Sequence, residues 1–106
     1  MDEHSQIVVP EAFLDLYRSP GRIRLALPRA EIVARHELCE DLAQSMTEHA
    51  RAMAVAGLIA EDEVLRRCLA GLRSAEAGLA DAEAVWTVRR LAELLDWPQP
   101  EVLDGA

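Results

Sequence analysis

Residues 28–57 read PRAEIVARHELCEDLAQSMTEHARAMAVAG, and this stretch decides the fold. Pro28 suits the first position of a helix, because its missing N–H would have no intrahelical partner there. Gly57 suits a left-handed stop at the other end. No helix breaker lies between the two residues. The stretch therefore predicts one long helix.

One side of this predicted helix is apolar. About thirty residues at 1.5 Å each give a length of roughly 45 Å, whereas a compact chain of this size is about 35 Å across. The helix must therefore project, kink, or have its surplus apolar stripe covered by a second subunit. We expect a homodimer, and the candidate self-association residues are those placed on the stripe by a spacing of about 100° per residue: Ile32, Cys39, Leu42, Ala43, Met46, Ala50 and Met53.

The segment before the long helix, residues 1–27, is predicted to be an N-terminal arm. It contains a short helix that starts at Pro10 and places Phe13, Leu14 and Tyr17 on one face. Residues 22–27 then alternate between apolar and other side chains, which indicates an extended segment. That segment could pair with residues near the N-terminus, pair with its symmetry mate, or lie along the long helix.

Two further helices are predicted after Gly57. The first spans residues 60–77, before Gly78, and the second begins with Asp81 as its N-cap and ends near Trp97, because prolines follow. We therefore expect an all-α fold, a small helical bundle in one domain of residues 1–106, with a body over 28–97 and a tail over 98–106. Its predicted core residues on these two helices are Val64, Leu65, Cys68, Leu69, Leu72, Val85, Val88, Leu91, Ala92 and Leu95.

Three side chains of the last helix lie off its core stripe. Trp86, Arg90 and Leu94 combine an aromatic ring, a guanidinium and an aliphatic group, which is the mixture enriched at the anchors of protein interfaces. They could instead cover the N-terminal arm of the same chain. This face is a candidate for binding a protein partner.

Composition limits the function classes. The net charge is −8, and all eleven basic residues are arginine. Such a surface repels nucleic acid and anionic membranes. No apolar run approaches the 18 or more residues that a membrane span needs, and residues 1–9 lack the basic start and long apolar stretch of a secretory signal. We expect a cytoplasmic protein that does not associate with membranes.

Sequence motifs for catalysis are missing. There is no phosphate-binding loop, which would require a lysine, and no dinucleotide, zinc-protease, nucleophile-elbow or calcium-loop pattern. Cys39 and Cys68 are isolated and are interpreted as buried thiols. We predict no catalytic residues, no metal ligands and no cofactor. Arg18, Arg22 and Arg24 form the start of the one basic concentration and are candidate contacts for an anion, or for nucleic acid, although the surrounding acidity opposes the latter.

Two stretches carry a family resemblance. Residues 7–14 (IVVPEAFL), continuing through Pro20-Gly21-Arg22, and residues 34–43 (ARHELCEDLA) resemble a family of small proteobacterial helical proteins whose members are often labelled "ATPase with chaperone activity". The resemblance spans about residues 7–55. Because the chain has no Walker motif, what the label implies is an accessory role beside an ATPase or chaperone partner.

Two function classes follow from the sequence. The first is a non-catalytic helical interaction or adaptor protein, which self-associates through the long helix and binds another protein. The second is a regulatory or nucleic-acid-binding protein that uses the arginine-rich arm, or an enzyme whose site combines arm arginines with acids such as Glu37 and Asp41. We favour the interaction protein, because this function does not depend on any of the missing motifs.

Overall fold

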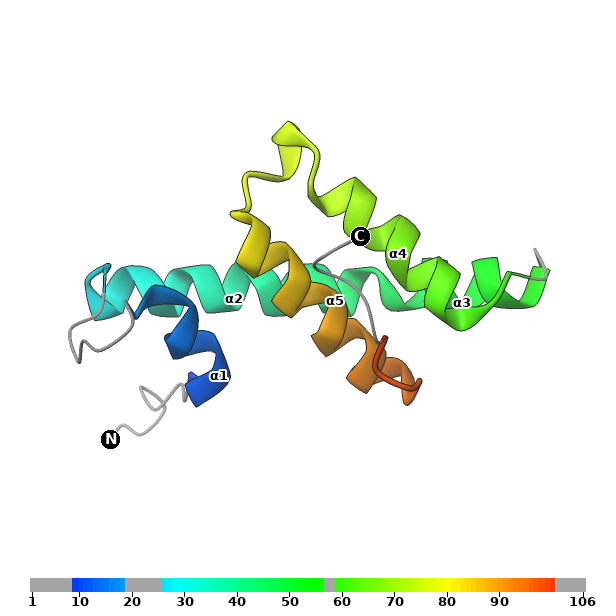
Figure 1. Ribbon diagram of the computed structural model, residues 1–106, viewed down its shortest axis with the longest axis horizontal. Coiled ribbons are helices and arrows are strands. Elements are labelled where there is room, and N and C mark those ends of the chain that lie inside the picture. The colour runs from blue at the N-terminus through cyan, green and yellow to red at the C-terminus, as the bar shows by residue number, and fades with distance from the viewer. Residues whose placement is uncertain (1–8, 19–25, 57–58, 101–106) are drawn as a thin grey trace. The chain divides into compact units, whose positions relative to one another are not determined.

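The structure is a computed structural model that describes residues 9–18, 26–56 and 59–100. Within these ranges every regular element is helical and no strand is present, which confirms the predicted all-α class. Figure 1 shows the elements in chain order: α1 (Glu11–Leu14), η2 (Asp15–Tyr17), α2 (Arg29–Ser45), α3 (Thr47–Ala56), α4 (Glu61–Leu72), η3 (Ala75–Ala77) and α5 (Asp81–Leu95).

Internal contacts divide the chain into two units, residues 1–38 and residues 39–106. The division falls inside α2. The first unit therefore holds α1, η2 and the beginning of α2, whereas the second holds the end of α2 together with α3, α4 and α5.

The first unit contains the predicted short helix. The carbonyl of Pro10 accepts hydrogen bonds from the backbone N–H groups of Phe13 (3.0 Å) and Leu14 (3.1 Å). Phe13 is fully buried, and its ring centroid lies 5.5 Å from that of Tyr17 and 5.3 Å from that of His36, edge-on to the latter. Phe13 thus anchors the short helix to the beginning of α2. Most of the predicted extended segment, residues 22–27, lies outside the described residues.

The predicted long helix is present but bends at Met46, one of the outcomes expected from its length. The Met46 N–H is shared between the carbonyls of Leu42 (3.1 Å) and Ala43 (3.3 Å). On either side of Met46, the Ser45 hydroxyl donates to the Leu42 carbonyl and the Thr47 hydroxyl donates to the Gln44 carbonyl, each at 2.9 Å. Side-chain hydroxyls that bond back to the preceding turn bend helices. The expectation of an unbroken helix is wrong at this point, because the Ser-Met-Thr sequence supplies two such groups.

The core of the second unit forms where α4 and α5 pack against each other and against α3. All five residues predicted for the core of α4 are buried, as are Val88, Leu91, Ala92 and Leu95 of α5. Val85 is an exception, because it is only half-buried and lies at the edge of the cluster. From the long helix, Ala43 and Ala50 enter the same cluster. Their small side chains allow close approach of the neighbouring helices.

Helix α4 is shorter than predicted. It ends at Leu72 rather than continuing to residue 77, and the short 3-10 turn η3 follows. The Ser74 hydroxyl and the Ser74 N–H both bond to the Gly71 carbonyl, at 2.8 and 3.2 Å. This pattern tightens the last turn and ends the helix. Gly78 does adopt the left-handed conformation, with φ of +70°, but it follows η3 and is not the residue that stops α4, so its predicted role as the stop of this helix is wrong.

Helix α5 begins one residue earlier than its predicted cap implies. Asp81 is the first helical residue and Ala80 precedes it as N-cap, so the assignment of Asp81 as N-cap is wrong by one position. The buried Glu83 carboxylate accepts the Ala80 N–H at 2.9 Å and satisfies this helix end instead. Asp81 pairs with Arg73 across the α4–α5 connection, with 3.3 Å between Nη2 and Oδ2. The helix ends at Leu95, before the left-handed Asp96 (φ 60°).

Two glycines provide a matched test of this backbone. Gly71 lies inside α4, and a Cβ built there would meet nothing within 4 Å, so Gly71→Ala should raise the unfolding free energy by about 0.5 to 1 kcal/mol. Gly78→Ala should lower the unfolding free energy by about 1 to 2 kcal/mol, because its φ is positive. Chemical denaturation of both variants checks the pair. Equal effects of the same sign would contradict the assigned conformations.

Candidate functional site

The apolar stripe of the long helix is already covered within one chain. Four of its seven candidate self-association residues are fully buried: Ile32, Cys39, Ala43 and Ala50. The other three, Leu42, Met46 and Met53, are half-buried and pack against the core of the second unit. The fully buried residues have no surface left for a second chain. The length of the helix predicted that a bend or a second subunit is needed. The bend is present, and in the second unit α4 and α5 cover the stripe at Ala43 and Ala50.

Arg90, a residue of the candidate partner face, is bound within the chain. Its Nε and Nη2 atoms donate to the two carboxylate oxygens of Glu40 at 2.8 and 3.0 Å, and its Nη1 donates to Glu93 at 3.0 Å. The hydrogen bond to Glu40 is the main cause of a raised Arg90 pKa, which burial opposes. This bidentate pair links α5 to the end of α2. Trp86 and Leu94, the other two members, are half-buried, and Leu94 packs against the core.

The candidate anion contacts are described in part. Arg18 donates to the carboxylates of Glu11 and Asp15, and these hydrogen bonds, the one to Glu11 first, raise the Arg18 pKa. The two carboxylates thus neutralise the Arg18 guanidinium, which makes Arg18 a weaker binding group for an anion. Arg22 and Arg24 lie outside the described residues.

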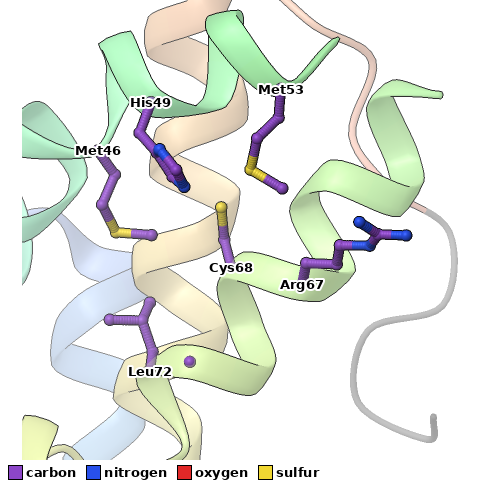
Figure 2. A pocket seen from close by; sticks show the side chains of 7 residues that line it. Met46, His49, Met53, Arg67, Cys68 and Leu72 are labelled. Atoms are coloured by element: carbon purple, nitrogen blue, oxygen red, sulfur yellow. The ribbon is translucent and has the colours of Figure 1, made fainter. Parts of the chain in front are cut away.

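A cleft that the sequence analysis missed lies between the bend, α3 and α4. It has a volume of about 320 Å³ and a mostly apolar lining. Figure 2 shows the side chains that surround it, which come from the bend and α3 on one side and from α4 on the other. The lining residues are Met46, His49, Met53, Arg67, Cys68, Gly71 and Leu72.

The spacing of the lining residues explains the cleft. Positions 46, 49 and 53 follow one another at i, i+3 and i+7, which places them on one helix face. Positions 68, 71 and 72 are spaced i, i+3 and i+4 and likewise share one face of α4. Gly71 brings no side chain to the wall, so the two helices leave space between them. This spacing was visible in the sequence, but only the packing of α3 on α4 makes the two faces meet.

The cleft is rich in sulfur and poor in charge. Its lining includes the thioethers of Met46 and Met53 and the thiol of Cys68, but no carboxylate. Burial raises the pKa of the Cys68 thiol, so the thiol is protonated at neutral pH and is a weak nucleophile. Arg67 bonds to Glu63 at 3.1 Å, and hydrogen bonds from Arg67 and then Arg66 lower the Glu63 pKa. This part of the surface is therefore internally neutralised.

Each half of the long helix also exposes apolar side chains on its outer side. On α3, Val55 is 79% exposed and the neighbouring Ala52 and Ala56 are exposed as well. On α2, Leu38 is 36% exposed and follows the exposed Ala34 at i, i+4. At 100° per residue, Ala34, Ala52 and Val55 lie opposite the buried stripe, whereas Leu38 and Ala56 lie at its side. We call the three residues of the second unit, Ala52, Val55 and Ala56, the outer face.

Comparison with known proteins identifies no relative, since no family model, curated protein or solved structure matches the chain. The resemblance to chaperone-associated ATPase proteins therefore stays a prediction. In the part of the chain that the structure describes, no helix has both the length and the apolar character to cross a membrane. Across the same residues, no three His, Cys, Asp or Glu side chains gather as a metal site. Function must be inferred from the surfaces themselves.

The Arg90–Glu40 pair should contribute measurably to stability. A double-mutant cycle with Arg90→Ala and Glu40→Ala is expected to give a coupling energy of up to about 1 kcal/mol, limited by solvent because the two side chains are 33% and 25% exposed. The Arg66–Asp62 pair is the control, because it is more exposed and its single contact is 3.5 Å long. A coupling for Arg90–Glu40 no larger than that of the control would contradict its role in joining α5 to α2.

Proposed function

We propose that this chain is a non-catalytic helical interaction protein that self-associates through the outer face of its long helix. The observation that carries the proposal is the exposure of Val55, at 79%, near the exposed Ala52 and Ala56. Val55 and the exposed alanines near it form a small apolar surface that a second helix could cover. The proposal moves the association surface from the buried stripe to the opposite side.

Small side chains make this outer face suitable for a second helix. Ala52 lies one turn before Val55 and Ala56 directly follows it on α3, so a facing helix could approach closely on that side of the valine. Leu38 with Ala34 offers a similar combination on α2. The partner that fits first is a second copy of the chain, since each copy carries the same small apolar surface and a symmetric dimer pairs like with like.

The chemistry of the cleft supports a non-catalytic reading. Cys68 and His49 both line it, which is the residue combination of a thiol nucleophile and a base. A catalytic thiol, however, needs a lowered pKa, and burial moves the Cys68 pKa in the other direction. The arrangement therefore favours binding over nucleophilic catalysis.

Charge makes the dimer sensitive to salt. Each chain has a net charge of −8, and the exposed acid Glu48 of α3 lies one turn before Ala52 of the outer face. Two such chains repel each other, and salt screens this repulsion within about 8 Å at physiological ionic strength. Self-association should therefore strengthen as salt is added, whereas binding of a basic partner would weaken.

Light scattering coupled to size-exclusion chromatography tests the proposal. The mass should rise toward twice the chain mass with increasing protein concentration, and Ala52→Asp should keep the protein monomeric, because the new charge would be buried without a partner. Ala70→Asp is the matched control, since it makes the same change at an exposed position of α4. A dimer that survives Ala52→Asp, or a chain that stays monomeric at all concentrations and salt levels, would contradict self-association through this face.

A further inference from the structure

The α3–α4 cleft gathers soft ligand atoms from two helices. Met46, His49 and Met53 come from the bend and α3, and Cys68 comes from α4. In Figure 2 the Met53 thioether, the Cys68 thiol and the His49 ring converge on the same space, with the Met46 thioether along the same wall. Two thioethers, a thiol and an imidazole thus surround one cleft.

We propose that this cleft binds one soft monovalent metal ion, Cu(I), through the sulfur atoms of Cys68 and Met53 and the imidazole of His49, with Met46 as a further thioether ligand. Thiolate and thioether sulfur select Cu(I), and imidazole also suits copper. Magnesium and calcium require oxygen ligands, and no carboxylate lines the cleft. Zinc sites use thiolate, imidazole and carboxylate but not thioether, so the methionines favour copper.

The charge around the cleft is compatible with a cation. Arg67 is the fixed positive charge of the lining, but its Nε bonds to Glu63 at 3.1 Å. Figure 2 shows the guanidinium directed away from the sulfur atoms. The lowered pKa of Glu63 keeps this carboxylate ionised beside it. Arg67 therefore adds little repulsion at the position where the metal would lie.

Binding is a ligand exchange without a change of oxidation state. The Cys68 thiol releases its proton to solvent as the copper–sulfur bond forms, the thioethers and the neutral imidazole donate lone pairs, and copper remains Cu(I). The positive charge of the ion and the negative charge of the thiolate then cancel inside the cleft. A coordinating thiol is deprotonated by its metal even where burial disfavours the free thiolate.

The alternative explanation for the sulfur is packing. Methionine fills irregular gaps in cores, and buried cysteine behaves as a small apolar residue. The two explanations predict different effects of replacing methionine by leucine. Leucine fills the volume of methionine at little cost in stability, but it has no lone pair to donate. Met53→Leu and Met46→Leu therefore separate ligation from packing in folded protein.

The experiment is an anaerobic competition for Cu(I) against bicinchoninate, a chromophoric chelator, with ascorbate as reductant. The full chain should remove one Cu(I) per chain from the chelator. Cys68→Ala should abolish the transfer. Met53→Leu should weaken the affinity for Cu(I) at least about tenfold, because mutation of residues that only support the ligands of a metal site already lowers metal affinity about 10–100-fold. Cys39→Ala is the matched control, because Cys39 is the other buried thiol and does not line the cleft.

Three results would overturn the proposal. The first is a chain that removes no Cu(I). The second is loss of transfer in Cys39→Ala to the same extent as in Cys68→Ala, which would indicate thiol chemistry independent of the cleft. The third is unchanged affinity in a folded double variant with both Met46→Leu and Met53→Leu. Because the outer face lies elsewhere, Ala52→Asp should bind Cu(I) like the parent chain, so failure of self-association and failure of metal binding are distinguishable.

Discussion

The second unit depends on the close packing of two helices against the inner face of the bent helix. Ala43 and Ala50 contribute small, fully buried side chains to the same cluster as Leu65, Leu69 and Leu91. Where the long helix presents alanine, the larger side chains of α4 and α5 fill the space, and burying each such leucine is worth about 1.5 to 3 kcal/mol. Because small side chains of one helix face large side chains of the others, the chain buries a core although it has few aromatic residues.

The bend at Met46 determines which parts of the long helix meet α4. Because the Ser45 and Thr47 hydroxyls bond to the preceding turn, α3 begins a new segment whose face carries His49 and Met53. That face lies against α4, and the absence of a side chain at Gly71 leaves space between them. The bend at Met46 thus helps to form the cleft described above.

The sequence predicted the helices well because their signals are local. Helical periodicity identified the core residues of α4 and most of those of α5, and the prolines after Trp97 placed the end of α5 within two residues, whereas α4 ends before the predicted stop at Gly78. The errors arose where side chains compete with the backbone: Ser74 at the end of α4, Glu83 at the start of α5, and the hydroxyls at the bend. Composition and periodicity do not show such hydrogen bonds.

The candidate site was less predictable, because it depends on which faces meet. Cys68 was correctly placed inside, but nothing in its neighbours along the chain indicates that His49 and Met53 lie across from it. Arg90 was assigned to a partner face because no sequence rule connects it to Glu40, fifty positions earlier. Contacts between residues far apart in sequence carry this information, and neither periodicity nor composition encodes them.

The long helix therefore has two chemically different sides, and each suggests its own role. The inner side packs into the core except near the bend, where it lines the cleft. There the long helix contributes the thioethers of Met46 and Met53 and the imidazole of His49, and no acidic or arginine side chain. The outer side carries exposed alanine and valine together with acidic side chains such as Glu48. Cys39 and Cys68 illustrate how position decides chemistry: the Cys39 thiol is fully buried and lies 3.9 Å from the Glu83 carbonyl, whereas the Cys68 thiol borders open space. A soft ion can reach only the second.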